Sequence, residues 1–352
     1  MQKEDIVKLK KKFTPIKTNA IKKIKPNLCI ICKKEINYTC VSHSIPKFIL
    51  KNISRTGNLY TWNKLVGIDI IENNKGLREA GVFRKICREC DNTIFKEYET
   101  PDNYQKSITN TMLHQISIKI LLNNIYTREM SVNLVKESIN QLINDKISKM
   151  LYERVANQMC LEPEKITIKE EYKKLNIILN SSIKNIRYKM IFNYKLPYVV
   201  PYAFQDEITL VSDMLGNSIN NVFSKDEKYR MQSIKLCIFP LKNETCIIMY
   251  REKQDKRYIR FEHQFNKLTI DDKIAVINYM VFLYSEKYLI SDYVDKKIFD
   301  SNIAKYSEMT QHNIYCIGDD PYTKEFRMKH RLDNFTNCEN LLSAKYALSK
   351  IE

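Results

Sequence analysis

Glycine and proline are scarce in this chain, with 6 and 9 occurrences in 352 residues. A flexible or low-complexity protein would be rich in both, so this composition favours an ordered chain built from many helices and strands. Glycine-rich phosphate loops are also missing, since the sequence contains no GxGxxG, no GKS or GKT and no GxSxG. The sequence therefore predicts none of the nucleotide-binding or hydrolase sites that those motifs build.

Long apolar runs are lacking as well. The longest run, residues 276–284, is interrupted by Asn278 and is far too short to span a bilayer. The N-terminus is rich in lysine but has no apolar core of the kind that a secretory signal needs. We therefore expect a soluble protein of the cytoplasm.

The ten cysteines are not spaced like those of a secreted disulfide scaffold. Six are scattered singly, mostly in apolar stretches, which is typical of reduced, buried cysteines in a cytosolic protein. The other four form two C-x₂-C pairs, Cys29 with Cys32 and Cys87 with Cys90. Because a tight C-x₂-C turn presents two thiolates to one metal ion, the two pairs predict a closed, structural zinc site.

The sequence also permits an alternative set of zinc ligands. Cys40 and His43 would complete a Cys₃His site with Cys29 and Cys32. That arrangement would make His43 a zinc ligand and would leave the second cysteine pair without a metal.

The charge is strongly positive, with 58 Lys and Arg against 41 Asp and Glu and a formal net charge of +17. It is concentrated near the N-terminus, where residues 1–100 carry 21 basic and 10 acidic side chains. Such a bias favours a polyanionic partner such as nucleic acid. An AT-rich genome, which raises the use of Lys, Asn and Ile, is the alternative explanation.

The chain divides into three parts by composition. Residues 1–26 are a basic leader, expected as a short helix, a nucleic-acid-contacting arm or a solvated tail. Residues 27–102 form the cysteine-histidine module, with a strand-and-loop insertion between its two cysteine pairs. Residues 103–352 predict a larger α+β domain, with helices at about 103–184 and mixed strands and helices from 185 to 352.

Within the larger domain, apolar periodicity predicts helices over 108–120, 132–147 and 165–184. Strands are predicted at 186–194, 234–239, 246–250 and 257–261, as a small antiparallel sheet. Thr269 and Asp272 form a capping box that opens an apolar helix reaching about residue 288. The fold class expected for the whole chain is therefore α+β.

The module resembles the HNH (ββα-metal) endonucleases of the zinc-stabilised, treble-clef type. Their signature is C-x₂-C, an acidic residue and His-x-x-Pro, then C-x₂-C-Asn at the start of a helix. Residues that match this signature are Cys29, Cys32, His43, Pro46, Cys87 and Cys90. The resemblance covers residues 27–100, and it implies a metal-dependent endonuclease.

The resemblance assigns roles to individual residues. His43 takes the place of the general base that deprotonates water, a task for which imidazole is suited at neutral pH. Ser42 stands where the family has an acidic metal ligand, and Asp91 stands where it has asparagine. We therefore expect Asp91, helped by Asn92, to hold a catalytic Mg²⁺ or Mn²⁺ ion, since hard divalent ions require oxygen ligands.

Substrate and partners follow from the same resemblance. The basic leader and Lys47, Lys51 and Arg55, just after His-x-x-Pro, would contact the phosphates of a nucleic acid, expected to be DNA. The C-terminal domain would supply target choice, dimerisation or docking to a partner protein. Family members with such domains resemble restriction or phage-defence effectors, so a defence-system sensor is one expected partner.

A non-catalytic function is the alternative. The same zinc module would then be an inactive adaptor that binds nucleic acid or protein. Ser42 favours this hypothesis, because it removes one carboxylate from the expected metal site.

Overall fold

The computed structural model of the chain describes residues 3–24, 26–36, 40–65, 68–144, 146–157, 161–181, 187–224, 226, 228–295 and 322–348. It divides into two compact units, each assembled from segments that are distant in sequence. The first unit takes Met1–Ser44, Val82–Thr100 and Thr111–Asn185, and the second takes Ile45–Gly81, Pro101–Asn110 and Ile186–Glu352. The domains expected from composition, 1–26, 27–102 and 103–352, divide the sequence differently.

The first unit contains the zinc-type cysteines and most of the long helices. Its two short strands, β1 (Ser42–His43) and β4 (Val82–Phe83), pair antiparallel. Its helices are α1 (Lys3–Lys23), α3 (Arg88–Ile94), α4 (Asn110–Leu142), α5 (Lys146–Ala156) and α6 (Glu162–Leu179). Only the first residue of α4, Asn110, is assigned to the second unit. The basic leader is thus helical, and its Ile16, Ala20 and Ile24 are buried at a spacing of four residues.

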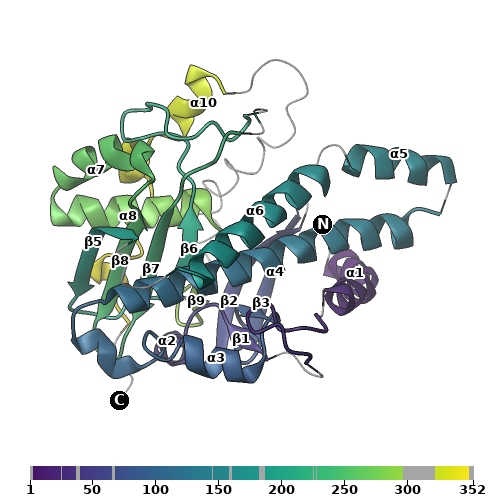
Figure 1. Cartoon of the computed structure of the whole chain (residues 1–352), viewed down its shortest axis with the longest axis horizontal. Helices are drawn as coiled ribbons and strands as arrows, with labels where there is room; N and C mark the ends of the chain where they lie inside the picture. The colour runs from purple at the N-terminus through teal and green to yellow at the C-terminus, as the bar shows by residue number, and fades with distance from the viewer. Residues whose placement is uncertain are drawn as a thin grey trace. The chain divides into compact units, whose positions relative to one another are not determined.

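The helical pattern after residue 103 is confirmed, although its division is not. Most of the two apolar stripes predicted as separate helices belongs to the single 33-residue helix α4, although Ile108 precedes this helix and Ile147 lies in α5. Helix α6 lies beside α4 (Figure 1), where Arg128 of α4 forms ion pairs with Glu164 and Glu171 of α6. These contacts join two segments that the sequence could only describe as consecutive.

An antiparallel sheet organises the second unit, and among the described residues it has seven strands in the order β3-β2-β9-β6-β7-β8-β5 (Figure 1). The strands are β2 (Asn58–Leu65), β3 (Ile68–Gly76), β5 (Tyr188–Leu196), β6 (Tyr202–Ile208), β7 (Ile234–Pro240), β8 (Thr245–Glu252) and β9 (Leu289–Ser291). The insertion between the cysteine pairs supplies β2 and β3, and Leu59 of β2 pairs with Ser291 of β9. The insertion therefore extends the sheet of the C-terminal region.

Helices complete the described part of the second unit. They are α2 (Lys47–Ile53), α7 (Ile259–Asn266), α8 (Ile270–Tyr284) and α10 (Lys324–Lys329), with 3₁₀ turns η1 (Pro101–Gln105), η3 (Lys256–Tyr258), η5 (Leu332–Asn337) and η6 (Ala344–Tyr346). Helix α8 packs against β6 and η5, and α2 packs against β6, β7 and β9. Every residue of β7 is buried, as expected for a central strand with both faces covered.

Two element predictions need correction. The segment predicted as a strand at 257–261 is helical, because Tyr258, Phe261 and Phe265 are buried at helical spacing while Ile259 is exposed. The helix opened by Thr269 ends at Tyr284 rather than near residue 288.

Within the described part of the chain, no helix combines the length and apolar character that crossing a membrane would require.

Candidate metal centre and the histidine strand

The first cysteine pair lies in a tight turn closed by backbone hydrogen bonds. The N–H of Cys29 donates to the carbonyl of Lys34 at 2.9 Å, and the N–H of Lys33 donates to the carbonyl of Cys29 at 2.9 Å. Lys33 has a φ of 61°, the left-handed region that reverses the chain here. This reversal places the two sulfurs of the pair at one end of the turn.

The second cysteine pair opens helix α3. Cys87 is the N-cap of the helix, and its sulfur accepts the N–H of Cys90 at 3.4 Å. Two backbone hydrogen bonds fix this segment beside the first turn: Ile30 N–H to Lys85 O at 3.1 Å and Cys40 N–H to Ile86 O at 2.9 Å. The pairs therefore meet although 55 residues separate Cys32 from Cys87.

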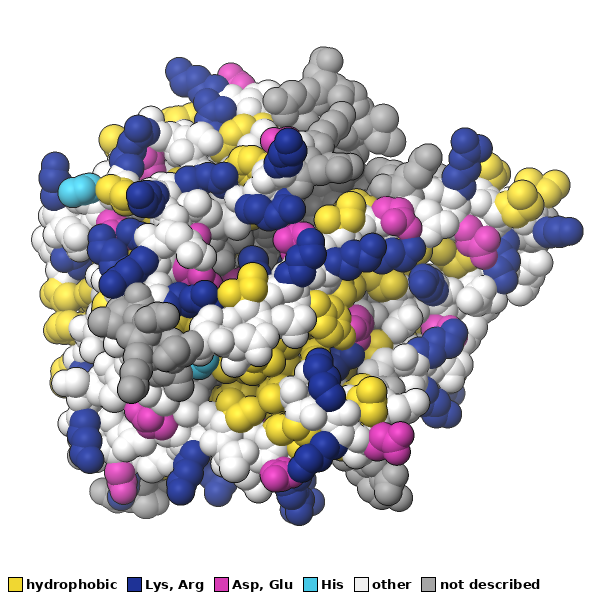
Figure 2. All heavy atoms as spheres, viewed as in Figure 1, with side chains coloured by type: hydrophobic (Ala, Val, Ile, Leu, Met, Phe, Trp, Pro, Cys, Tyr) yellow, Lys and Arg dark blue, Asp and Glu magenta, His cyan; other side chains and the backbone are white. Residues whose placement is uncertain are grey.

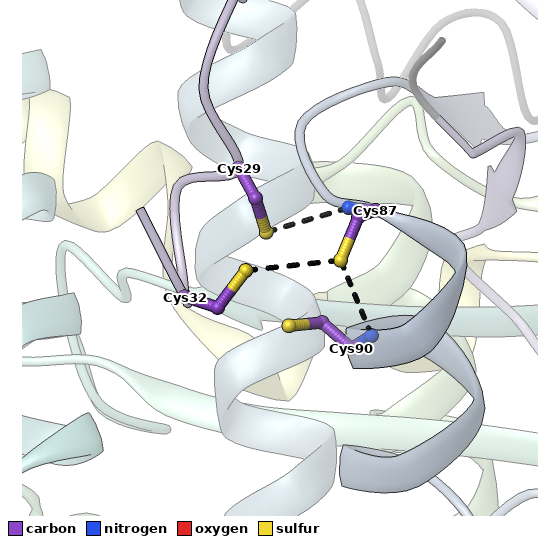
Figure 3. A group of neighbouring side chains, drawn as sticks. All are labelled: Cys29, Cys32, Cys87 and Cys90. Atoms are coloured by element: carbon purple, nitrogen blue, oxygen red, sulfur yellow. Dashed lines mark hydrogen bonds between the residues drawn. The ribbon is translucent and has the colours of Figure 1, made fainter. Parts of the chain in front are cut away.

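The four sulfur atoms form one cluster, with all of them within 4.8 Å of one another. Figure 3 shows Cys29 and Cys32 reaching from a loop toward Cys87 and Cys90 at the start of a helix. The distance between the sulfurs of Cys32 and Cys87 is 3.8 Å. Four sulfurs bound tetrahedrally to one zinc ion at about 2.3 Å would lie about 3.8 Å apart. The arrangement fits a structural zinc ion, as the cysteine spacing predicted.

Backbone amides support the thiolate form of Cys29. Burial acts to raise the pKa of this thiol, yet hydrogen bonds from backbone groups at Cys32, Cys87 and Ile31 lower it to about 7. One of these is the N–H of Cys87, which lies 3.4 Å from the Cys29 sulfur. Because zinc binds thiolates, a lowered thiol pKa favours loading of the site.

Cys40 and His43 are not part of this cluster. The thiol of Cys40 donates to Oδ2 of Asp91 at 3.5 Å. The cluster contains both cysteines of the second pair, which the Cys₃His alternative would leave without a metal. The structure therefore favours the four-cysteine site.

His43 lies on β1, where it pairs with Val82 of β4. Its neighbour Ser42 is 1% exposed, whereas His43 is half-buried. Successive side chains of a strand point to opposite faces, which explains why one is enclosed and the other remains accessible. After β4 the chain runs directly into the second cysteine pair, which opens α3.

The carboxylate of Asp91 is held by the enclosed side of β1 and by α4. Its Oδ1 accepts from Ser42 Oγ at 2.6 Å and from the Nζ of Lys119 at 2.9 Å. Lys119 also forms an ion pair with Glu99 at 2.9 Å. Burial acts to raise the pKa of Asp91, but the ammonium group of Lys119 and the Ser42 hydroxyl bring it below its usual value. Burial raises the pKa of Glu99 despite the same ammonium group.

These contacts do not fit a divalent ion at Asp91. A positively charged Nζ already lies at hydrogen-bonding distance from the oxygen that such an ion would need. Apart from the four cysteines, the described residues include no group of three His, Cys, Asp or Glu side chains placed to share a metal. We therefore derive no catalytic step through a metal at Asp91.

Comparison with known proteins gives no further guide. No family model matches the chain, and no curated protein or solved structure matches it. The function must be argued from the residues and their geometry.

The remaining predicted site residues lie in several places. Asn92 is exposed on α3, next to Asp91. Lys47 and Lys51 are exposed on α2 and line an open groove of about 610 Å³. Arg55 follows that helix and is not among the residues that line the groove; its guanidinium lies 5.0 Å from the ring centroid of Tyr293.

Sequence reasoning missed two residues of these sites. Arg78, from the end of the insertion, lines the same groove as the α2 lysines, and no local pattern could have paired it with them. Lys119 had a signal, because it lies three residues after Ile116 on the predicted apolar stripe of α4. A charged residue on the buried face of a helix requires buried partners.

Proposed function

We propose that residues 27–44 and 82–100, both in the first unit, form a zinc-stabilised, treble-clef module of the HNH type that hydrolyses phosphodiester bonds in DNA. What supports the proposal is the order of elements around the cysteine cluster. A cysteine turn is followed by β1 with His43; α2, β2 and β3 then belong to the second unit, and the chain returns to the first unit with β4 and the second cysteine pair that opens α3. This is the ββα order that the resemblance implies, with the histidine on the first strand.

His43 is the proposed general base. The backbone pairing of β1 with β4 holds its main chain, and its side chain is only half-buried, as a base that meets water requires. A positioned imidazole can take a proton from water at neutral pH. The cysteine cluster would act only as the scaffold, because four thiolates leave zinc no open position.

Mg²⁺ or Mn²⁺ remains the expected cofactor of such a nuclease, in which it stabilises charge on the scissile phosphate. Asp91 with Asn92 was the predicted binding site. Since Lys119 and Ser42 already engage the Asp91 carboxylate, the proposal assigns this chain only the roles of base, scaffold and phosphate contact.

A second candidate function is favoured by that same ion pair. If no divalent ion binds near His43, the module is an inactive adaptor that binds nucleic acid or protein. The basic groove with Lys47 and Lys51 serves either function. The second unit would supply target choice, self-association or docking to a partner protein, such as the sensor of a defence system.

Cleavage of supercoiled plasmid and of single-stranded DNA, with Mg²⁺ or Mn²⁺, tests the proposal. Wild type should cut, and His43→Ala should lose activity by about 10²- to 10⁴-fold, the usual range for removal of a general base. His263→Ala is the matched control, because His263 is exposed on α7 in the second unit. All three proteins must carry equal zinc.

The other outcomes are also informative. DNA binding without cleavage by wild type would favour the adaptor. If His43→Ala lost its zinc, His43 would be a ligand and the catalytic role would fall.

A further inference from the structure

Lys119 is enclosed within the first unit, in the part of α4 that is almost entirely buried. Its relative exposure is 0%, and Ile116, Ile118 and Ile120 beside it on the helix are also buried. A lysine is almost never buried this completely unless its charge is paired. The partners of its ammonium group therefore determine its role.

Three oxygen atoms surround the ammonium group. Nζ lies 2.9 Å from Oδ1 of Asp91, 2.9 Å from Oγ of Ser42 and 2.9 Å from Oε1 of Glu99. A lysine ammonium offers three N–H donors and no acceptor. These three oxygens, which we call the oxygen cage, therefore use its full capacity for hydrogen bonds.

An aromatic ring lies close to the same group. The ring centroid of Phe95 is 3.8 Å from Nζ, within the range of a favourable cation–π contact. Phe95 itself is fully buried. The cage is therefore built around one positive charge that belongs to the protein.

The same oxygens are of the type that hard divalent ions select, since two are carboxylates and one is a hydroxyl. Two of them come from Ser42 and Asp91, the positions at which the resemblance to HNH nucleases predicts metal ligands. A divalent ion and an ammonium group in one buried cage would repel each other strongly. The cage therefore accommodates one cation or the other.

We propose that Lys119 is the resident cation of the oxygen cage, and that its ammonium group takes the place of the divalent ion expected at Asp91. The inference rests on contacts within the first unit and does not use the proposed nuclease activity, but it removes Asp91 as the place for the divalent ion of that activity. It makes Asp91 and Lys119 positioning residues. One ammonium group links β1 through Ser42, α3 through Asp91 and the segment after α3 through Glu99 to helix α4.

The wild-type protein allows a direct test by NMR of zinc-loaded samples with ¹⁵N-labelled lysine. A protected ammonium signal, assigned by its loss in Lys119→Arg, should persist unchanged in excess Mg²⁺. A shift or loss of that signal on addition of Mg²⁺ would overturn the proposal. This measurement does not require a variant in which the cage has lost its charge.

Mn²⁺ binding to the zinc-loaded protein, followed by electron paramagnetic resonance, gives a second test. Wild type and Asp91→Asn should bind Mn²⁺ equally weakly. Lys119→Met keeps the aliphatic stem and removes the charge, so Mn²⁺ should bind at least about tenfold more tightly. The double variant Lys119→Met/Asp91→Asn should lose this gain.

Lys85→Met is the matched control, since Lys85 is also buried in the first unit and pairs with Glu129 instead. It should leave Mn²⁺ binding at the wild-type level. Tight Mn²⁺ binding by wild type that Asp91→Asn abolishes would contradict the proposal, as would a folded Lys119→Met that gains no Mn²⁺ site.

Discussion

At the scale of single residues, the cysteines differ in what surrounds them. Cys237, Cys246 and Cys338 are buried in the second unit, and burial raises the pKa of each thiol. In the cluster, the sulfurs of Cys29 and Cys87 accept backbone N–H groups, and all four sulfurs lie within 4.8 Å of one another. The surroundings of a cysteine, and not the number of cysteines in the chain, indicate whether it is a metal ligand or a packing residue.

Replacing one cluster cysteine should release the zinc ion. We expect Cys87→Ala to lose most of its zinc and the folding of the first unit, because zinc supplies about 10–16 kcal/mol in small zinc domains. Metal analysis of the purified protein measures this. Cys40→Ala, whose thiol faces Asp91, should retain one zinc per chain; zinc loss in Cys40→Ala with zinc retained in Cys87→Ala would favour the Cys₃His site.

His330 predicts a pH dependence of stability. Burial lowers its pKa and Lys329 lowers it further, against a hydrogen bond between Nδ1 and the carbonyl of Phe326 at 2.8 Å. Below pH ~6.5 the unfolded chain therefore binds a proton more readily than the folded one. The free energy of unfolding should fall as the pH falls below that value, by at most about 1.4 kcal/mol per pH unit.

Urea unfolding between pH 7.5 and 5.5 measures this slope. His330→Gln has no titrating group at this position and should show a smaller loss of stability over that range. An equal slope in wild type and variant would mean that other groups dominate.

At the scale of elements, a prediction was correct where the decisive contacts lie within a few residues and wrong where they lie farther along the chain. The capping box at Thr269 was read correctly because a cap involves only neighbouring residues: Thr269 Oγ1 accepts the N–H of Asp272 at 3.2 Å. The strand predicted at 257–261 was wrong. Five residues are too few to separate the strand period from the helix period, and Phe265, whose burial indicates a helix, lies beyond them.

Removing the α8 cap should destabilise the second unit. Thr269→Ala leaves N-terminal amides of the helix without an acceptor, which costs about 1 kcal/mol of unfolding free energy. Thr269→Ser retains a hydroxyl acceptor and should lie within a few tenths of a kcal/mol of wild type. Denaturant titrations compare the three; a full loss in Thr269→Ser would show that the methyl group matters and the cap does not.

At the scale of the whole molecule, the net charge of +17 is the main indication of a polyanionic partner. Lys and Arg side chains are spread over the face drawn in Figure 2. Charge spread in this way attracts a polyanion but does not determine where the polyanion binds. The groove lined by Lys47, Lys51 and Arg78, with Glu79 as its one acidic lining residue, is the place where we propose that phosphates bind.

We expect this groove to contribute to the salt dependence of DNA binding. Each phosphate contact contributes about 0.9 to the slope of log K against log salt concentration. The triple variant Lys47→Gln/Lys51→Gln/Arg78→Gln should therefore reduce that slope by about 2 to 3, measured by fluorescence anisotropy.

A charge-matched control separates this site from general attraction. Lys242→Gln/Arg260→Gln/Lys267→Gln removes the same charge from exposed positions outside the groove. This control variant should change the slope by less than about 0.9, the contribution of one phosphate contact. Equal slopes for the two triple variants would leave the groove without a special role.

Some properties of this protein were determined by the sequence alone, because they depend on neighbours in the chain. The C-x₂-C spacing, the capping box and the apolar periods of α4 and α8 each act over a few residues. They sufficed to predict the four cysteines that could bind zinc, the mixture of helix and sheet, and the long helices α4, α6 and α8.

The tertiary structure decided what depends on residues distant in sequence. Pairing of β2 with β9 places the insertion in the main sheet, and α4 brings Lys119 to Ser42, Asp91 and Glu99. No local pattern encodes which lysine meets which carboxylate, because burial of the whole helix imposes that pairing. The resemblance predicted a divalent ion at Asp91, and only the fold showed that Nζ of Lys119 lies 2.9 Å from its carboxylate.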